Sequence, residues 1–220
     1  MAVTLRGAVF DLDGTILDSS GIWRRIDEEF LGRRGFAVPP DYYDAIAPLG
    51  FAGAAEYTIS RFHLREKPED ILAEWQEMSE DAFAHRIGLK PGVAAYLQLL
   101  AEKHIPCAVA TASHRSLYEP ALKNNGIFGY FSHFVTSAQV KRGKGFPDVY
   151  LAAAERIGVS PAQCAVFEDI VPGVVGARAG GFFTVAVADE AAHASEEQLR
   201  ALSDLYIESF EQLLENDIFP

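Results

Sequence analysis

Short apolar runs alternate with longer amphipathic stretches over most of the chain. Runs bounded by polar or turn-forming residues predict buried strands, and apolar positions at helical spacing predict helices. We expect strands at residues 7–10, 105–110, 134–136, 165–167 and 183–187, with an edge strand at 206–207. The helices expected among them span residues 93–103, 118–124, 148–157, 174–179 and 210–214. Right-handed crossovers would make this an α/β fold with a doubly wound, mainly parallel, Rossmann-like sheet.

One stretch interrupts the alternation, because residues 18–86 carry helical patterns and no predicted strand. Ser19 or Ser20 is expected to cap a first helix with an apolar stripe at Ile22, Ile26 and Phe30. Further helices are expected at residues 41–47, 52–62 and 68–85. We therefore predict an all-helical cap domain at 18–86, inserted into a core domain of residues 1–17 and 87–220. Hinges are expected near residues 17–20 and 86–91.

The first predicted strand ends in two carboxylates, Asp11 and Asp13, followed by Gly14. Strand side chains alternate, so the two carboxylates are expected on the same side where the chain leaves the sheet. Like charges this close need a cation, a shared proton or a reaction that uses them. A plain acidic turn is the alternative. An EF-hand loop is excluded, because its sixth and twelfth places would be Ile16 and Ile22 instead of Gly and Glu.

Polar groups also follow two other predicted strands and occupy one loop. The strand at 105–110 runs into Thr111-Ala112-Ser113, the strand at 165–167 runs into Glu168-Asp169, and Lys144 lies in a Gly-rich loop before Pro147-Asp148. The carboxyl ends of parallel strands lie along one edge of the sheet, where open α/β folds bind ligands. One site is therefore expected to gather several carboxylates, hydroxyls and a lysine.

These four segments resemble, in order and spacing, the motifs of the haloacid dehalogenase-like hydrolases. Within that superfamily the chain is similar to the branch of small phosphatases and β-phosphoglucomutases, which insert a helical cap after the first motif. The resemblance covers the first twenty residues and residues 90–190 well, and the cap only loosely. It implies a phosphatase that hydrolyses a small phosphomonoester, possibly a sugar phosphate.

The resemblance also implies roles for the site residues. A carboxylate can attack phosphorus directly, so Asp11 is the expected nucleophile that forms an aspartyl phosphate. Asp13 is expected to act as general acid and then as general base. Mg²⁺ is the expected cofactor, held by Asp169, Asp11 and the backbone carbonyl of Asp13. Glu168 is either a further ligand or a neighbour of the ligands. The phosphate-binding residues are expected to be Thr111, Ala112, Ser113 and Lys144, and Lys144 is also expected to pair with the nucleophile.

Three glycines, Gly173, Gly176 and Gly180, raise the alternative of a dinucleotide site. That alternative fails, because Glu168 and Asp169 lie where a pyrophosphate would approach and the spacing differs from G-x-G-x-x-G. Close packing of a helix on the sheet is the expected reason for these glycines.

The net charge and the composition of the chain limit which binding partners and which cellular compartment are expected. The formal net charge of −12 argues against nucleic acid or an anionic membrane as a partner. The N-terminus lacks an apolar signal core, and no run approaches the roughly eighteen apolar residues of a membrane span. A cytoplasmic monomer or small homo-oligomer is therefore expected. Cys107 and Cys164 lie in or beside predicted buried strands and are expected to be structural thiols.

Two cap positions separate hydrolysis from phosphoryl transfer between sugar positions. Mutases of this superfamily carry a His twelve residues after the nucleophile and an Arg after a Gly on a cap loop, whereas this chain has Trp23 and, by alignment, Gly53 there. Their absence favours hydrolysis. A β-phosphoglucomutase-like phosphohexose mutase stays as the alternative, and a metal-binding regulatory protein without catalytic activity is the alternative outside the enzymes.

Overall fold

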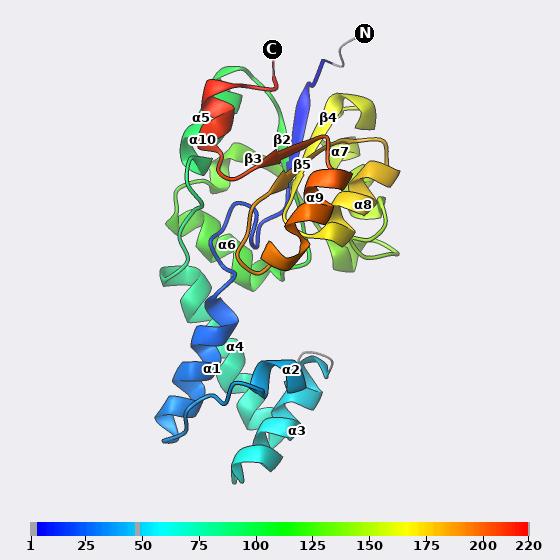
Figure 1. The fold of residues 1–220 in the computed structure, drawn as a ribbon. Helices are drawn as coiled ribbons and strands as arrows, with labels where there is room; N and C mark the ends of the chain where they lie inside the picture. The colour runs from blue at the N-terminus through cyan, green and yellow to red at the C-terminus, as the bar shows by residue number, and fades with distance from the viewer. Residues whose placement is uncertain (1–3, 47–48, 220) are drawn as a thin grey trace. The chain divides into compact units, whose positions relative to one another are not determined.

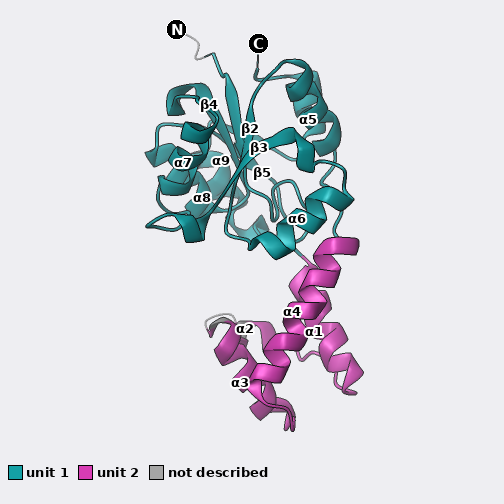
Figure 2. Cartoon of the chain, turned by 180° about the vertical axis from the view of Figure 1, so that it is seen from behind, with its two compact units in different colours: residues 1–20, 87–220 teal, residues 21–86 magenta. Residues whose placement is uncertain are grey.

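A computed structural model describes residues 4–46 and 49–219, and it divides the chain into two compact units. One unit runs to Ser20 and resumes at Ile87, and the other spans Gly21–Arg86 (Figures 1 and 2). Among the described residues, no helix is both long and apolar enough to cross a membrane. Cys107 and Cys164 are free and buried, as expected for structural thiols.

The first unit contains a six-stranded parallel sheet in the order β3-β2-β1-β4-β5-β6, so the predicted α/β fold is confirmed (Figure 1). Its strands are β1 (Gly7–Phe10), β2 (Cys107–Thr111), β3 (Phe131–Thr136), β4 (Cys164–Glu168), β5 (Phe183–Val187) and β6 (Leu205–Ile207). The expected second strand was placed too early, since Ile105 and Pro106 precede β2 and Thr111 belongs to it. The register sets Phe10 opposite both Val109 and Phe167, which aligns the carboxyl ends of three strands.

Helices cover both faces of this sheet (Figures 1 and 2). They are α5 (Val93–Glu102), α6 (Arg115–Asn124), α7 (Asp148–Arg156), α8 (Val171–Ala179), α9 (Glu196–Leu202) and α10 (Glu211–Glu215). Short 3₁₀ turns lie at Phe128–Tyr130, Ser137–Gln139, Pro161–Gln163 and His193–Ser195. Helix α9 was not predicted from the sequence.

Successive side chains of a strand point to opposite faces of the sheet, so neighbouring residues pack against different helices. Val9 and Val166 belong to a buried cluster that includes residues of α7 and α8. Phe10 and Phe167 stack on each other with ring centroids 4.4 Å apart, and both contact Phe210 at the start of α10. The two faces are therefore filled by different residues of the same strands, which fixes the position of each strand end.

The second unit is helical, with α1 (Ile22–Arg33), α2 (Tyr42–Ile46), α3 (Gly50–Phe62) and α4 (Pro68–His85). The expected apolar stripe of α1 is buried, and its Phe30 ring meets Trp75 of α4 edge to face at 5.4 Å. Buried Tyr42 of α2 shares a 2.7 Å hydrogen bond with Thr58 of α3. The expected helix at 41–47 ends in Ala47, which lies outside the described residues.

The expected cap of α1 by Ser19 or Ser20 is wrong. Gly21 is the N-cap residue, and no side chain caps this helix. Both serine hydroxyls are committed to carboxylates of the first unit, since Ser19 donates to Asp13 and Ser20 to Asp189. Their hydrogen bonds fix the chain before the helix begins.

Candidate active site

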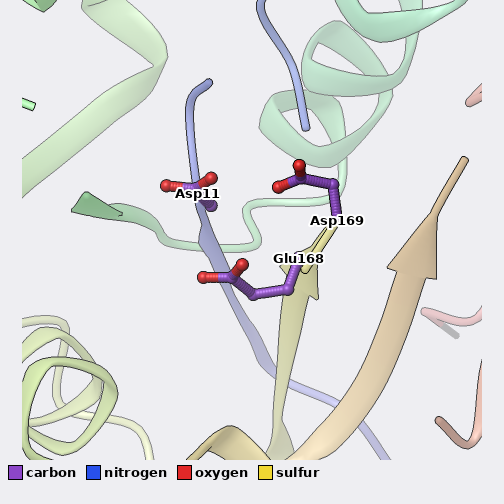
Figure 3. A group of neighbouring side chains, drawn as sticks. All are labelled: Asp11, Glu168 and Asp169. Atoms are coloured by element: carbon purple, nitrogen blue, oxygen red, sulfur yellow. The ribbon is translucent and has the colours of Figure 1, made fainter. Parts of the chain in front are cut away.

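Three buried carboxylates meet where β1 and β4 end. Asp11 follows β1, Glu168 is the last residue of β4, and Asp169 follows it (Figure 3). One carboxylate oxygen of each lies within 4.8 Å of the others. The Asp11 N–H donates to the Phe167 carbonyl at 3.0 Å, which extends the ladder past the strand and holds the three groups in register. The predicted gathering of these carboxylates at one sheet edge is therefore observed.

Lys144 reaches this cluster from the loop before α7. Its ammonium group pairs with the Asp11 carboxylate and lies 2.7 Å from Glu168 Oε1. Burial lowers the pKa of Lys144, but the charges of Asp11 and Glu168 outweigh burial and raise that pKa above its usual value. The lysine is therefore a fixed cation, and its contact with Asp11 agrees with the pairing expected from the sequence.

The carboxyl groups of this cluster outnumber its one cation, Lys144. Burial is the main cause that raises the pKa of Asp169 and of Glu168, and the charge of Asp11 adds to both shifts. Thr15 donates to Asp169 at 2.9 Å, and Tyr150 donates to Glu168 Oε1 at 2.8 Å. Within the described part of the chain, buried Glu168 Oε2 has no hydrogen-bond partner. A cluster of hard oxygen ligands with excess negative charge and an unsatisfied oxygen fits a divalent cation such as Mg²⁺.

Asp13 is held by two hydroxyl groups instead of a cation. Ser19 donates to Asp13 Oδ1 at 3.0 Å, and the Ser113 hydroxyl donates to Oδ2. Burial, followed by the charge of Asp11, raises the pKa of Asp13 despite these hydrogen bonds. A carboxyl group with a raised pKa is suited to carry a proton.

The segment after β2 lies at the same edge. Thr111 ends β2 and is buried, and its hydroxyl oxygen accepts the Ser113 N–H at 3.0 Å across Ala112. Because Ser113 also donates to Asp13, the turn after β2 is joined to the turn after β1. The roles expected for Thr111, Ala112 and Ser113 in phosphate binding stay predictions.

The glycines of α8 correct one expectation from the sequence. A Cβ on Gly176 would overlap the carbonyl oxygen of Lys144 and would lie 3.0 Å from the Phe146 N atom. A Cβ on Gly173 would overlap the Glu168 carboxyl group. Gly176 therefore lets the loop that carries Lys144 approach the helix, and sheet packing is the wrong explanation for it.

Asp189, a buried carboxylate just beyond β5, was not predicted from the sequence as a site residue. Lys90 lies 2.7 Å from it, and Ser20 also donates to it, so both segments that lead to the helical unit are attached to one side chain. Burial raises the pKa of Asp189, but these hydrogen bonds outweigh burial and lower it. The missed signal was an acid two residues after the predicted strand at 183–187, close to the pattern that identified Asp11 and Glu168.

The comparison with protein families decides the assignment. A model of haloacid dehalogenase-like hydrolases matches residues 5–181. The chain belongs to this family. Curated relatives of this haloacid dehalogenase-like hydrolase include two proteins of Escherichia coli K12. Fructose-1-phosphate phosphatase YqaB is 33% identical over 82% of this chain and 95% of its own length. Hexitol phosphatase A is 33% identical over 94% of this chain and 93% of its own length.

Solved structures agree with the fold. A candidate β-phosphoglucomutase from Thermotoga maritima superposes with a TM-score of 0.86 at 23% identity, over 97% of this chain and all of that one. CbbY from Rhodobacter sphaeroides in complex with phosphate gives a TM-score of 0.74 at 23% identity, with 96% of both chains covered. At these identities the structures establish the fold alone. The family and the phosphatase relatives make this haloacid dehalogenase-like hydrolase a phosphoric monoester hydrolase.

Proposed function

We propose that this hydrolase is a Mg²⁺-dependent phosphatase that releases phosphate from small phosphomonoesters, with sugar phosphates as the first candidates. The observation that carries the proposal is the contact of Lys144 with Asp11 and Glu168 beside Asp169, because a carboxylate beside a cation and a cluster of oxygen ligands is the arrangement that phosphoryl transfer to Asp11 would use. The two Escherichia coli relatives, named for fructose 1-phosphate and hexitol phosphates, support the substrate class.

Asp11 and Asp169, with the backbone carbonyl of Asp13, are the proposed Mg²⁺ ligands. Glu168 is bound through Oε1 to Lys144 and Tyr150, which leaves Oε2 for the ion or its waters. When bound, Mg²⁺ would offset the negative charge that the phosphoryl oxygens and carboxylates share. Lys144 and the segment Thr111-Ala112-Ser113 are the proposed partners of the substrate phosphate.

The proposed reaction has two displacements at phosphorus. Asp11 attacks the phosphorus atom and forms an aspartyl phosphate, while the bond to the leaving oxygen breaks and Asp13 gives that oxygen a proton. Asp13 then takes a proton from water, whose oxygen attacks the aspartyl phosphate and restores the Asp11 carboxylate. The raised pKa of Asp13 supports its role as the proton donor in the first displacement.

The helical unit is the proposed cap domain, with hinges near residues 17–20 and 86–91. The two connecting segments pair with each other, since the Asp18 N–H donates to the Gly88 carbonyl at 3.0 Å and the Lys90 N–H to the Ile16 carbonyl at 3.0 Å. Trp23 and Gly53 stand where mutases of this superfamily carry His and Arg, which favours release of phosphate over its return to the sugar.

The test measures phosphate release from fructose 1-phosphate, hexitol phosphates and other small phosphomonoesters, with Mg²⁺ and after chelation. Release should require Mg²⁺ and should fall by at least about 10³-fold in Asp11→Asn, because the amide is a poor nucleophile. Sugar 1-phosphates are assayed in parallel for conversion to 6-phosphates. Conversion without net release would replace the phosphatase by a mutase, and release that survives in Asp11→Asn would contradict the mechanism.

A further inference from the structure

Three residues of the α/β unit, Ser20, Lys90 and Asp189, form a buried group that we call the Asp189 cluster. The side chain of Asp189 is 2% exposed and that of Lys90 is 10% exposed. Asp189 Oδ1 accepts the Ser20 hydroxyl, and it also accepts the Ala191 N–H at 2.9 Å. Asp189 Oδ2 accepts the Lys90 ammonium group at 2.7 Å. Both carboxylate oxygens are therefore occupied by the protein, which suits Asp189 to hold other segments and not to bind metal or substrate.

The Asp189 cluster holds the connecting segment, residues 13–20, at three points. At its start, a Cβ on Gly14 would lie 3.4 Å from the Cγ of Asp189, so the two residues lie side by side. In its middle, the Ile16 carbonyl accepts the Lys90 N–H at 3.0 Å. At its end, the serine of the cluster is itself the last residue of the segment. One buried ion pair with its backbone therefore fixes the start, the middle and the end of this segment.

The connecting segment begins with the proposed proton donor. Asp13 directly precedes Gly14, which lies beside the Asp189 carboxyl group. Ser19 directly precedes Ser20, and it donates to Asp13 Oδ1 at 3.0 Å. Two contacts of Asp189 are thus each one residue away from Asp13 itself or from the serine that holds it.

The proposed nucleophile is held in a different way. Asp11 follows β1 directly, and its N–H donates to the Phe167 carbonyl at 3.0 Å, so the sheet fixes its position. A displacement of the connecting segment should therefore move the carboxyl group of Asp13 more than that of Asp11. Such a displacement matters, because a proton donor must lie within hydrogen-bond reach of the leaving oxygen.

We propose that Asp189 is a positioning residue for the phosphatase reaction, and that with Lys90 and Ser20 it places the Asp13 carboxyl group where it can reach the leaving oxygen. This inference rests on the proposed function. It predicts an effect that depends on the leaving group, because only a leaving oxygen that takes up a proton needs Asp13 in the first displacement.

The leaving group separates a loss of positioning from a loss of stability. Sugar and hexitol phosphates have alkoxide leaving groups that need a proton, whereas the leaving groups of acetyl phosphate and p-nitrophenyl phosphate need none. The value of kcat/KM covers the steps up to departure of the leaving group. The ratio of kcat/KM for the best sugar or hexitol phosphate to kcat/KM for acetyl or p-nitrophenyl phosphate therefore measures proton donation. When both values come from one preparation, this ratio does not depend on the fraction of folded protein.

Three variants disturb the Asp189 cluster. Asp189→Asn and Lys90→Met break the buried ion pair, and Ser20→Ala removes one hydrogen bond to it. In the first two variants, kcat/KM for the sugar or hexitol phosphate should fall by about 10²-fold, and kcat/KM for acetyl and p-nitrophenyl phosphate by less than about 5-fold. Ser20→Ala should lower the ratio by about 3-fold, and it keeps the comparison possible if folding requires the ion pair.

Lys103→Met is the matched control. Lys103 lies 2.8 Å from Asp217 and donates to a backbone carbonyl, as Lys90 does, but it precedes β2 and so lies at the opposite edge of the sheet. This variant should lose stability and keep the wild-type ratio. A wild-type ratio in every variant of the Asp189 cluster that folds would overturn the inference and leave the proposed function intact. Failure of the wild-type protein to release phosphate from all of these substrates would overturn the proposed function, and this inference with it.

Discussion

The two units of this hydrolase bury carboxyl groups in different ways. In the α/β unit, Asp11 and Glu168 share Lys144, and Asp169 receives a hydrogen bond from Thr15. In the helical unit, Asp27 is also buried, with 8% of the residue exposed, but its side chain has no hydrogen-bond or ion-pair partner among the described residues. Burial raises the pKa of Asp169 in the α/β unit and the pKa of Asp27 in the helical unit. The two units differ in whether a donor or a cation pairs with the buried carboxyl group.

The α/β unit therefore holds its buried carboxylates with fixed partners, whereas the helical unit leaves Asp27 without one among the described residues. Fixed donors and the cation of Lys144 hold the carboxylates of the proposed active site in one geometry, which is what a reaction that develops charge requires. The carboxyl group of Asp27 has no such support among the described residues. Substitutions in the α/β unit can disturb the partners of its buried carboxylates. A substitution in the helical unit can remove the unpaired charge of Asp27.

The largest effect is expected from Lys144→Met, which removes the cation shared by Asp11 and Glu168. Phosphate release should fall by about 10²- to 10³-fold, and the free energy of unfolding should fall by about 3 kcal/mol, because buried carboxylates lose their partner. Lys141→Met, at an exposed lysine of the same loop, is the matched control for both assays. A Lys144→Met protein that is as active and as stable as Lys141→Met would show that the contact has neither role.

Gly176→Ala tests whether the close approach of the loop to α8 is needed to place Lys144. The added methyl group must displace the Lys144 carbonyl, at a cost of about 1–3 kcal/mol in unfolding free energy and with a loss of activity. Gly32→Ala is the control, because its Cβ meets no atom within 4 Å and alanine favours a helix by up to about 1 kcal/mol. Denaturant unfolding should therefore move in opposite directions for the two variants.

Asp27→Asn tests the uncompensated carboxyl group through the pH dependence of stability. The folded-state pKa of about 7 lies above the ordinary 3.8, so ionisation of Asp27 destabilises the folded unit. This destabilisation should grow from pH about 4 and level off above pH about 7. Relative to wild type, Asp27→Asn should gain roughly 1–3 kcal/mol between pH 5 and pH 8. Glu28→Gln should show no such gain, and parallel stability profiles of wild type and Asp27→Asn would refute the raised pKa.

Tyr150→Phe is expected to have the smallest effect. It removes the hydroxyl that donates to Glu168 at 2.8 Å, and the Mg²⁺ concentration needed for half-maximal phosphate release should rise by about 10-fold. Tyr96→Phe is a matched control, because the Tyr96 hydroxyl is equally buried but has no hydrogen-bond partner within the described residues. An unchanged Mg²⁺ dependence in Tyr150→Phe would mean that this hydrogen bond does not support the metal site.

Local patterns were sufficient to predict the sheet and the cluster of carboxylates at its edge. Apolar runs identified β1 and β5 with their observed bounds, and acids at the carboxyl ends of β1 and β4 identified Asp11, Glu168 and Asp169. Such features depend on neighbours in sequence, so one chain is enough to find them.

Contacts between distant segments were not predictable in the same way. Ser20 resembles a helix cap, but Asp189, far along the chain, accepts its hydroxyl instead. Tyr150 is one position in a helical pattern, and only the fold turns its hydroxyl to Glu168. Asp27 lies on α1 between Ile26 and Glu28, where the sequence does not show that neighbouring helices bury it.

Transfer of the phosphoryl group to Asp11 can be observed by trapping the aspartyl phosphate. Asp13→Asn is mixed with p-nitrophenyl phosphate, whose leaving group needs no proton, so Asp11 can react but the water step lacks its base. After an acid quench, mass spectrometry should find one phosphoryl group on the peptide that contains Asp11. The Asp11→Asn/Asp13→Asn double variant should carry none. Steady turnover by Asp13→Asn without this adduct, or an adduct that persists in the double variant, would contradict the account.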